Sequence, residues 1–152
     1  NTGVRCEESS KSKSMKIFLG GTCNESTWRD QLIPYLKIDC FNPVVEDWTP
    51  ECQDEEIRQR QTCDVVLYMI TPKMTGVYAI AEVVDDSNKR PKKTIFVVLR
   101  KDGDKEFTES QMRSLDMVSK MVDFNGGRSF IFKEFRKESI EILANFLNEY
   151  SY

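Results

Sequence analysis

Carboxylates are the side chains in this sequence best suited to catalysis, because the chain of 152 residues contains no histidine. That absence excludes Ser-His-Asp and Cys-His catalysis and histidine-based zinc sites. Glu82 is the first candidate, since it lies inside a predicted helix but off the apolar stripe of that helix. A carboxylate in such a position can act as a nucleophile if it points into a pocket. The competing interpretation is a solvated helix carboxylate.

A strand, a helix and a second strand must position Glu82. The runs 65–70 and 94–99 are rich in β-branched residues and are typical of strands buried on both faces. We predict that the helix between them starts after Gly76, carries Glu82 about two turns in, and stops in the turn-like segment 85–88. Its apolar residues follow the i, i+3, i+4, i+7 spacing: Val77, Ile80, Ala81 and Val84.

The carboxyl edge of the predicted sheet is the expected ligand site. A right-handed crossover brings the start of the Glu82 helix to that edge, where open α/β sheets bind ligands. The first strand of the chain ends at the same edge in Gly20, Gly21 and Thr22, where glycines permit a tight turn or the close approach of a ligand. The loop after the second strand carries Trp48, which either stacks on a planar ligand or packs against the protein.

Strands alternate with helices along the chain, which predicts a doubly wound α/β fold. We expect a mostly parallel five-stranded sheet in the flavodoxin-like order 2-1-3-4-5. The predicted strands are 15–19, 39–41, 65–70, 94–99 and 129–132. Further helices are predicted after Thr27, over 51–62, after Thr108 and over 135–150. The 51–62 helix is so polar that we expect it on the outside of the domain or against a partner subunit.

Composition limits the class of protein. Residues 15–152 suffice for a single domain with a substantial core, whereas residues 1–14 are expected to be a flexible tail or a remnant of cloning. The net charge of −3 gives no basic surface for a nucleic-acid polymer, and no apolar run has the length of a membrane span. The five cysteines form no CxxC pair, which favours reduced thiols in the cytoplasm.

The order of these parts resembles the nucleoside 2-deoxyribosyltransferase family and its nucleotide N-glycosidase relatives. The stretches that carry the resemblance are KIFLGGT at 16–22, CDVVLYMITP at 63–72 and GVYAIAEVVDDSNKRPKKTIFVV at 76–98. In that family a strand begins just after an Asp, and a helix carries a Glu that is followed by a basic-Pro step into the next strand. Here Asp64, Glu82 and Arg90-Pro91 match these features.

The resemblance implies cleavage or transfer at the N-glycosidic bond of a 2′-deoxynucleoside or deoxynucleotide. Glu82 would attack the anomeric carbon and form a covalent deoxyribosyl ester, with no metal or other cofactor. Asp64 is the second catalytic candidate, although an Asp before a buried strand also commonly caps a turn. Two positions depart from the family pattern: Phe18 stands where members often have a Tyr, and Gly76 where many have a sugar-binding Asp. Tyr78 is the residue that could supply a hydroxyl instead.

Other functions remain open from the sequence. A nucleotide-binding or assembly module would keep the fold without releasing a base, and an NAD glycohydrolase would use a similar Glu. Transferase and hydrolase differ only in whether a base or water reaches the covalent intermediate. The expected ligand is a small-molecule nucleoside or nucleotide, and the resemblance implies a homo-oligomer in which a neighbouring subunit helps to close the pocket.

Overall fold

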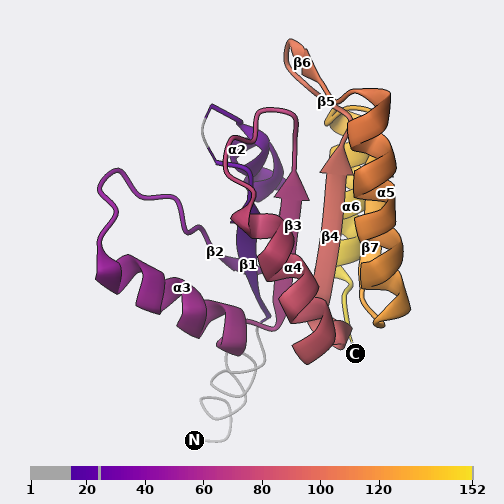
Figure 1. Cartoon of the computed structure of the whole chain (residues 1–152). Coiled ribbons are helices and arrows are strands. Elements are labelled where there is room, and N and C mark those ends of the chain that lie inside the picture. Colours follow the sequence, from indigo (N-terminus) through magenta and orange to yellow (C-terminus); the bar gives the residue numbers. More distant parts are fainter. Residues whose placement is uncertain (1–14, 24, 152) are drawn as a thin grey trace, which may run out of the picture.

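A five-stranded parallel sheet forms the centre of the computed structural model, which describes residues 15–23 and 25–151 (Figure 1). The tail expected at 1–14 lies outside the described residues. The strands lie in the order β2-β1-β3-β4-β7, which confirms the predicted fold and strand order. They are β1 (Lys16–Gly21), β2 (Asp39–Phe41), β3 (Val65–Ile70), β4 (Thr94–Leu99) and β7 (Arg128–Phe132).

Helices cover both faces of this sheet (Figure 1). One face packs against α4 (Tyr78–Lys89) and α5 (Glu109–Phe124). The other packs against α2 (Trp28–Leu32) and α6 (Lys137–Asn148). The polar helix α3 (Pro50–Thr62) stands away from the sheet on the β2 side, and Gln59 is its one buried residue. The remaining elements are η1 (Ile33–Tyr35), η2 (Pro91–Lys93) and an unpredicted hairpin of β5 (Lys101–Asp102) and β6 (Lys105–Glu106).

The central strands are buried because their side chains alternate between two apolar layers. Every residue of β3 and of β4 is buried. Within β3, Val65 and Leu67 face the layer that holds α6, whereas Val66 and Tyr68 face the layer that holds α4. Among the described residues, no helix has the length and apolar character needed to cross a membrane.

The structure corrects the predicted end of the first strand. β1 continues through Gly20 and Gly21 instead of stopping at Leu19. Gly21 has a φ of +111°, and a Cβ at this position would lie 2.0 Å from the carbonyl oxygen of Met69 in β3. Glycine is therefore required here for the close approach of two strands, and not for a turn.

The predicted end of the Glu82 helix is also wrong. α4 begins at Tyr78 and continues to Lys89, through the segment 85–88 that the sequence predicted as a turn. Two polar residues of this segment, Asp86 and Ser87, are buried, and each has side-chain partners inside the protein. Because their polar groups are satisfied there, the helix does not end where its composition turns polar.

Candidate active site

A pocket of about 230 Å³ lies between α3 and α4. Glu82 and Tyr78 enter it from α4, and Trp48 enters it from the loop before α3. The aromatic residues form the outer part, since Trp48 is 60% and Tyr78 is 65% exposed, whereas the Glu82 side chain is only 18% exposed. The complete lining is Trp48, Gln53, Glu56, Ile57, Arg60, Tyr78 and Glu82.

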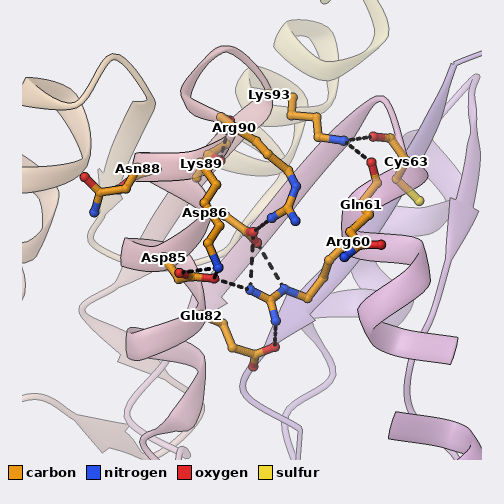
Figure 2. A network of polar contacts seen from close by, with 12 residues as sticks. Arg60, Gln61, Cys63, Glu82, Asp85, Asp86, Asn88, Lys89, Arg90 and Lys93 are labelled. Atoms are coloured by element: carbon orange, nitrogen blue, oxygen red, sulfur yellow. Dashed lines mark hydrogen bonds and ion pairs between the residues drawn. The ribbon is translucent and has the colours of Figure 1, made fainter. Parts of the chain in front are cut away.

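Arg60 of α3 is the cation that holds the two helices together at this pocket (Figure 2). Its Nη1 lies 3.4 Å from Oε2 of Glu82, and its Nη2 lies 3.4 Å from Oδ2 of Asp85. Its Nε donates to Oδ2 of Asp86 at 3.2 Å. The three carboxylates occupy positions i, i+3 and i+4 of α4, so one helix face presents them all to a single guanidinium. The Arg60 side chain is 11% exposed, which limits the screening of these contacts by water.

Asp86 anchors this network from the protein interior. Its side chain is fully buried and accepts hydrogen bonds from Arg60, from Arg90 and from the hydroxyl of Tyr68 in β3. Burial and the adjoining Asp86 carboxylate raise the pKa of Tyr68, so its hydroxyl remains a donor. Two guanidinium groups and one hydroxyl therefore compensate a carboxylate that would be unstable alone at this depth.

Hydrogen bonds hold both ends of α3. At its start, Thr49 Oγ1 accepts a hydrogen bond from the backbone N–H of Cys52, and Pro50 occupies the first helical position. At its end, Nζ of Lys93 donates to the carbonyl oxygens of Gln61 and Cys63 at 2.8 and 2.7 Å. These contacts leave the middle of α3, with Glu56 and Arg60, facing the pocket.

The environment of Glu82 makes its carboxyl group a weaker acid than an ordinary Glu side chain. Burial raises the pKa of Glu82 to about 7, and the neighbouring carboxylates of Glu56 and Asp86 act in the same direction. Arg60 acts against them by favouring the ionised form. Burial also raises the pKa of Glu56, which lines the opposite wall. The pocket can thus provide both an ionised carboxylate and a carboxylic acid near neutral pH. The described residues contain no group of three or more cysteine or carboxylate side chains arranged to hold a metal ion.

The raised pKa of Glu82 leads to a prediction about stability. Because the value in the folded protein exceeds the ordinary 4.5, folding favours the protonated acid. The stabilising contribution of this group is complete below about pH 4.5 and is lost as the pH rises through about 7. Urea denaturation at about pH 5 and about pH 8 measures this change. Between these pH values, we expect the free energy of unfolding of the wild-type protein to fall by on the order of 1 to 2 kcal/mol more than that of Glu82→Gln. Equal losses in the two proteins would contradict the raised pKa.

Three of the residues predicted from the sequence meet in this pocket: Trp48, Tyr78 and Glu82. Tyr78 precedes Glu82 by four residues on α4, so the two side chains lie on the same helix face. Gly76 lies just before this helix, and a Cβ built there would meet nothing within 4 Å. The position that holds Asp in many members of the resembled family therefore has open space around it.

The glycine segment after β1 is not part of the pocket lining. Thr22 is buried, and its Oγ1 accepts a hydrogen bond from the N–H of Thr71 at 3.0 Å. The carbonyl oxygens of Leu19, Gly21 and Thr22 accept from the guanidinium of Arg29, which is also buried. A Cβ at Gly20 would approach Phe18 and Tyr68 to within 3.0 Å. Close internal packing explains this segment without a ligand.

Asp64 lies at the amino edge of the sheet and does not line the Glu82 pocket. Its Oδ2 accepts a hydrogen bond from the backbone N–H of Lys16 at 2.9 Å, and its own N–H donates to the Lys16 carbonyl. Asp64 therefore joins the starts of β1 and β3. The structure does not bring together the two catalytic residues predicted from the sequence.

Sequence reasoning missed Glu56, Arg60 and the role of Asp86. The sequence predicted a turn over 85–88, but the Asp86 side chain in this segment is fully buried. A usable signal existed in the spacing of Glu56 and Arg60, which lie four residues apart and so share one face of a helix with few apolar residues. A polar helix face of this kind needs charged partners, and α4 provides them.

The family model with the description "Nucleoside 2-deoxyribosyltransferase like" matches residues 14–103, which is more than half of the chain. The matched segment runs from β1 through β5 and contains every residue of the pocket lining. No curated protein and no solved structure matches the chain.

Proposed function

The chain belongs to the nucleoside 2-deoxyribosyltransferase-like family, and from this premise we propose that it cleaves or transfers at the N-glycosidic bond of a 2′-deoxynucleoside or deoxynucleotide. The observation that supports this proposal most strongly is the placement of Glu82. Its carboxylate is largely buried, faces a pocket with an aromatic rim, and is paired with Arg60. These are the properties that a carboxylate nucleophile in glycosyl transfer requires.

In the proposed reaction the ionised Glu82 attacks the anomeric carbon of the deoxyribose. The bond from this carbon to the base nitrogen breaks, its electron pair leaves with the base, and a deoxyribosyl ester forms on Glu82. Water or a second base then attacks the same carbon and releases the carboxylate. Arg60 favours the ionised form of Glu82 before the attack, Trp48 stacks on the base, and the Tyr78 hydroxyl contacts the sugar.

Base release from a panel of substrates tests this function. The protein is incubated with each 2′-deoxynucleoside, each 5′-monophosphate and NAD, with and without a second base, and the products are separated by chromatography. Free base or a new nucleoside supports the proposal and separates hydrolysis from transfer. Binding of deoxynucleosides without base release would instead identify a binding module, and release of nicotinamide would identify an NAD glycohydrolase.

We also propose that the protein forms a homodimer through the α4 and α5 face. Met117, Met121 and Phe124 of α5 are 70%, 51% and 90% exposed and follow the i, i+4, i+7 spacing of one helix stripe. Beside this stripe lies an apolar groove of about 670 Å³ between α4 and α5. A twofold axis would place the stripe of each copy in the groove of the other.

Light scattering tests the dimer directly. We expect a mass of twice the 17.7 kDa of the chain, and a shift toward the monomer when Phe124 is replaced by Ser. The control is Ile142→Ser on α6, which removes an exposed apolar side chain from the other layer. A monomer at high concentration would contradict the proposal.

A further inference from the structure

Glu56 faces Glu82 across the pocket and comes from a different helix. It lies on α3 one turn before Arg60, and all three side chains line the same cavity. The ion pair of Arg60 in this pocket is with Glu82. Among the described residues, Glu56 takes part in no side-chain hydrogen bond or ion pair, so its carboxyl group is not committed to a structural contact.

We propose that Glu56 is the proton-transfer residue of this pocket, which protonates the departing base and later deprotonates the incoming water or base. The inference rests on the proposed function and adds to it a second catalytic carboxyl group. Glycosyl transfer through a covalent intermediate requires such a pair, one group as nucleophile and the other as acid and then base. Asp64 is in no position for this role, because it lies at the amino edge of the sheet.

The protons balance over the two steps. In the first, Glu82 forms a bond to the anomeric carbon while the bond to the base breaks, and the base nitrogen takes the proton of the Glu56 carboxylic acid. In the second, water attacks the anomeric carbon, its proton goes to the Glu56 carboxylate, and the ester bond to Glu82 breaks. Glu56 regains its proton and Glu82 its charge, so no further reactant is needed.

The charges around Glu56 are consistent with this cycle. Burial raises the pKa of Glu56, whereas the guanidinium groups of Arg29 from α2 and Arg60 from α3 lower it. Across the pocket, the charge of Glu56 acts with burial to raise the pKa of Glu82. Arg60 lowers the pKa of both carboxyl groups, but its ion pair in the pocket is with Glu82, which favours Glu82 as the ionised member and Glu56 as the acid.

Substrates with different leaving groups test the role of Glu56. For a natural 2′-deoxynucleoside, we expect Glu56→Gln to lower kcat/KM by roughly 10² to 10³-fold. For 4-nitrophenyl 2-deoxyribofuranoside, whose leaving group departs without a proton, we expect a loss of less than about 3-fold in the first step. Asp54→Asn, which changes an exposed carboxylate of α3 outside the pocket, is the matched control and should leave both rates unchanged.

The pH profile provides a second measurement. With the natural substrate, the wild-type rate should fall on the alkaline side of its pH profile as Glu56 loses its proton, and Glu56→Gln should lose this descending limb. An equal loss of kcat/KM on both substrates, with an unchanged pH profile, would show that Glu56 has a structural role alone and would overturn the inference. A full rate in Glu56→Gln on the natural base would also overturn it. If the wild-type protein and Glu82→Gln are equally inactive on both substrates, the proposed function itself has failed.

Discussion

Replacement of Glu82 by Gln is expected to abolish base release, with a loss of roughly 10³-fold or more, while the protein remains folded. Gln occupies nearly the same volume but cannot attack the anomeric carbon. The fold should tolerate the change because the carboxylate lies on the pocket wall and Arg60 retains its contacts with Asp85 and Asp86. Loss of activity without loss of structure would mark a chemical role.

The covalent intermediate provides the most direct evidence for this role. A 2-deoxy-2-fluoroarabinosyl nucleoside should leave its sugar on the wild-type protein, because fluorine destabilises the cationic transition state through which the ester breaks. Intact-mass measurement should show the added sugar, and peptide mapping should locate it on Glu82. The Glu82→Gln protein should remain unlabelled under the same conditions.

Asp116→Asn is a suitable control for these experiments. Asp116 is also a helix carboxylate, but it lies on α5, is 49% exposed and pairs with Lys120 at the surface. We expect the Asp116→Asn variant to release base at the wild-type rate and to acquire the fluorinated sugar as the wild-type protein does. Turnover by Glu82→Gln at the wild-type rate, or an adduct on another residue, would show that the nucleophile has been assigned incorrectly.

The predicted parts of the fold depend on local rules. The runs 65–70 and 94–99 became strands with the predicted bounds because β-branched residues and burial on both faces act within a few residues of sequence. The strand order followed from the alternation of strands and helices, for which a doubly wound sheet in the flavodoxin-like order is the default. The angular position of Glu82 on its helix placed it off the apolar stripe, and the structure finds it on a pocket wall.

The unpredicted parts depend on contacts between distant segments. The composition of 85–88 is typical of a turn, and contacts with the distant residues Tyr68 of β3 and Arg60 of α3 help to explain why Asp86 is buried inside a helix. Asp64 and Glu82 are both acidic residues near a strand or helix start, and the sequence alone does not separate an edge contact from a pocket residue. Glu56 was missed for the same reason, since its position in the pocket depends on α3 lying opposite α4.

Replacement of Asp86 by Ala is expected to have the largest effect on stability, with a loss of about 3 to 5 kcal/mol in the free energy of unfolding. The variant leaves the guanidinium groups of Arg60 and Arg90 and the hydroxyl of Tyr68 without their common acceptor. Urea denaturation at neutral pH measures the change. Asp85→Asn is the matched control, because Asp85 pairs with the same Arg60 but is 44% exposed, and we expect it to cost less than about 1 kcal/mol.

A double-mutant cycle distinguishes a buried charge network from simple loss of packing. If the cost of Asp86→Ala arises from unpaired guanidinium groups, then removing one of them should recover part of it. We therefore expect Arg60→Met combined with Asp86→Ala to be more stable than Asp86→Ala alone. The double variant should nevertheless lack activity, because Glu82 loses its cation and α3 loses its charged contact with α4. Additive losses in the cycle would contradict a coupled network and indicate that Asp86 stabilises α4 independently of Arg60.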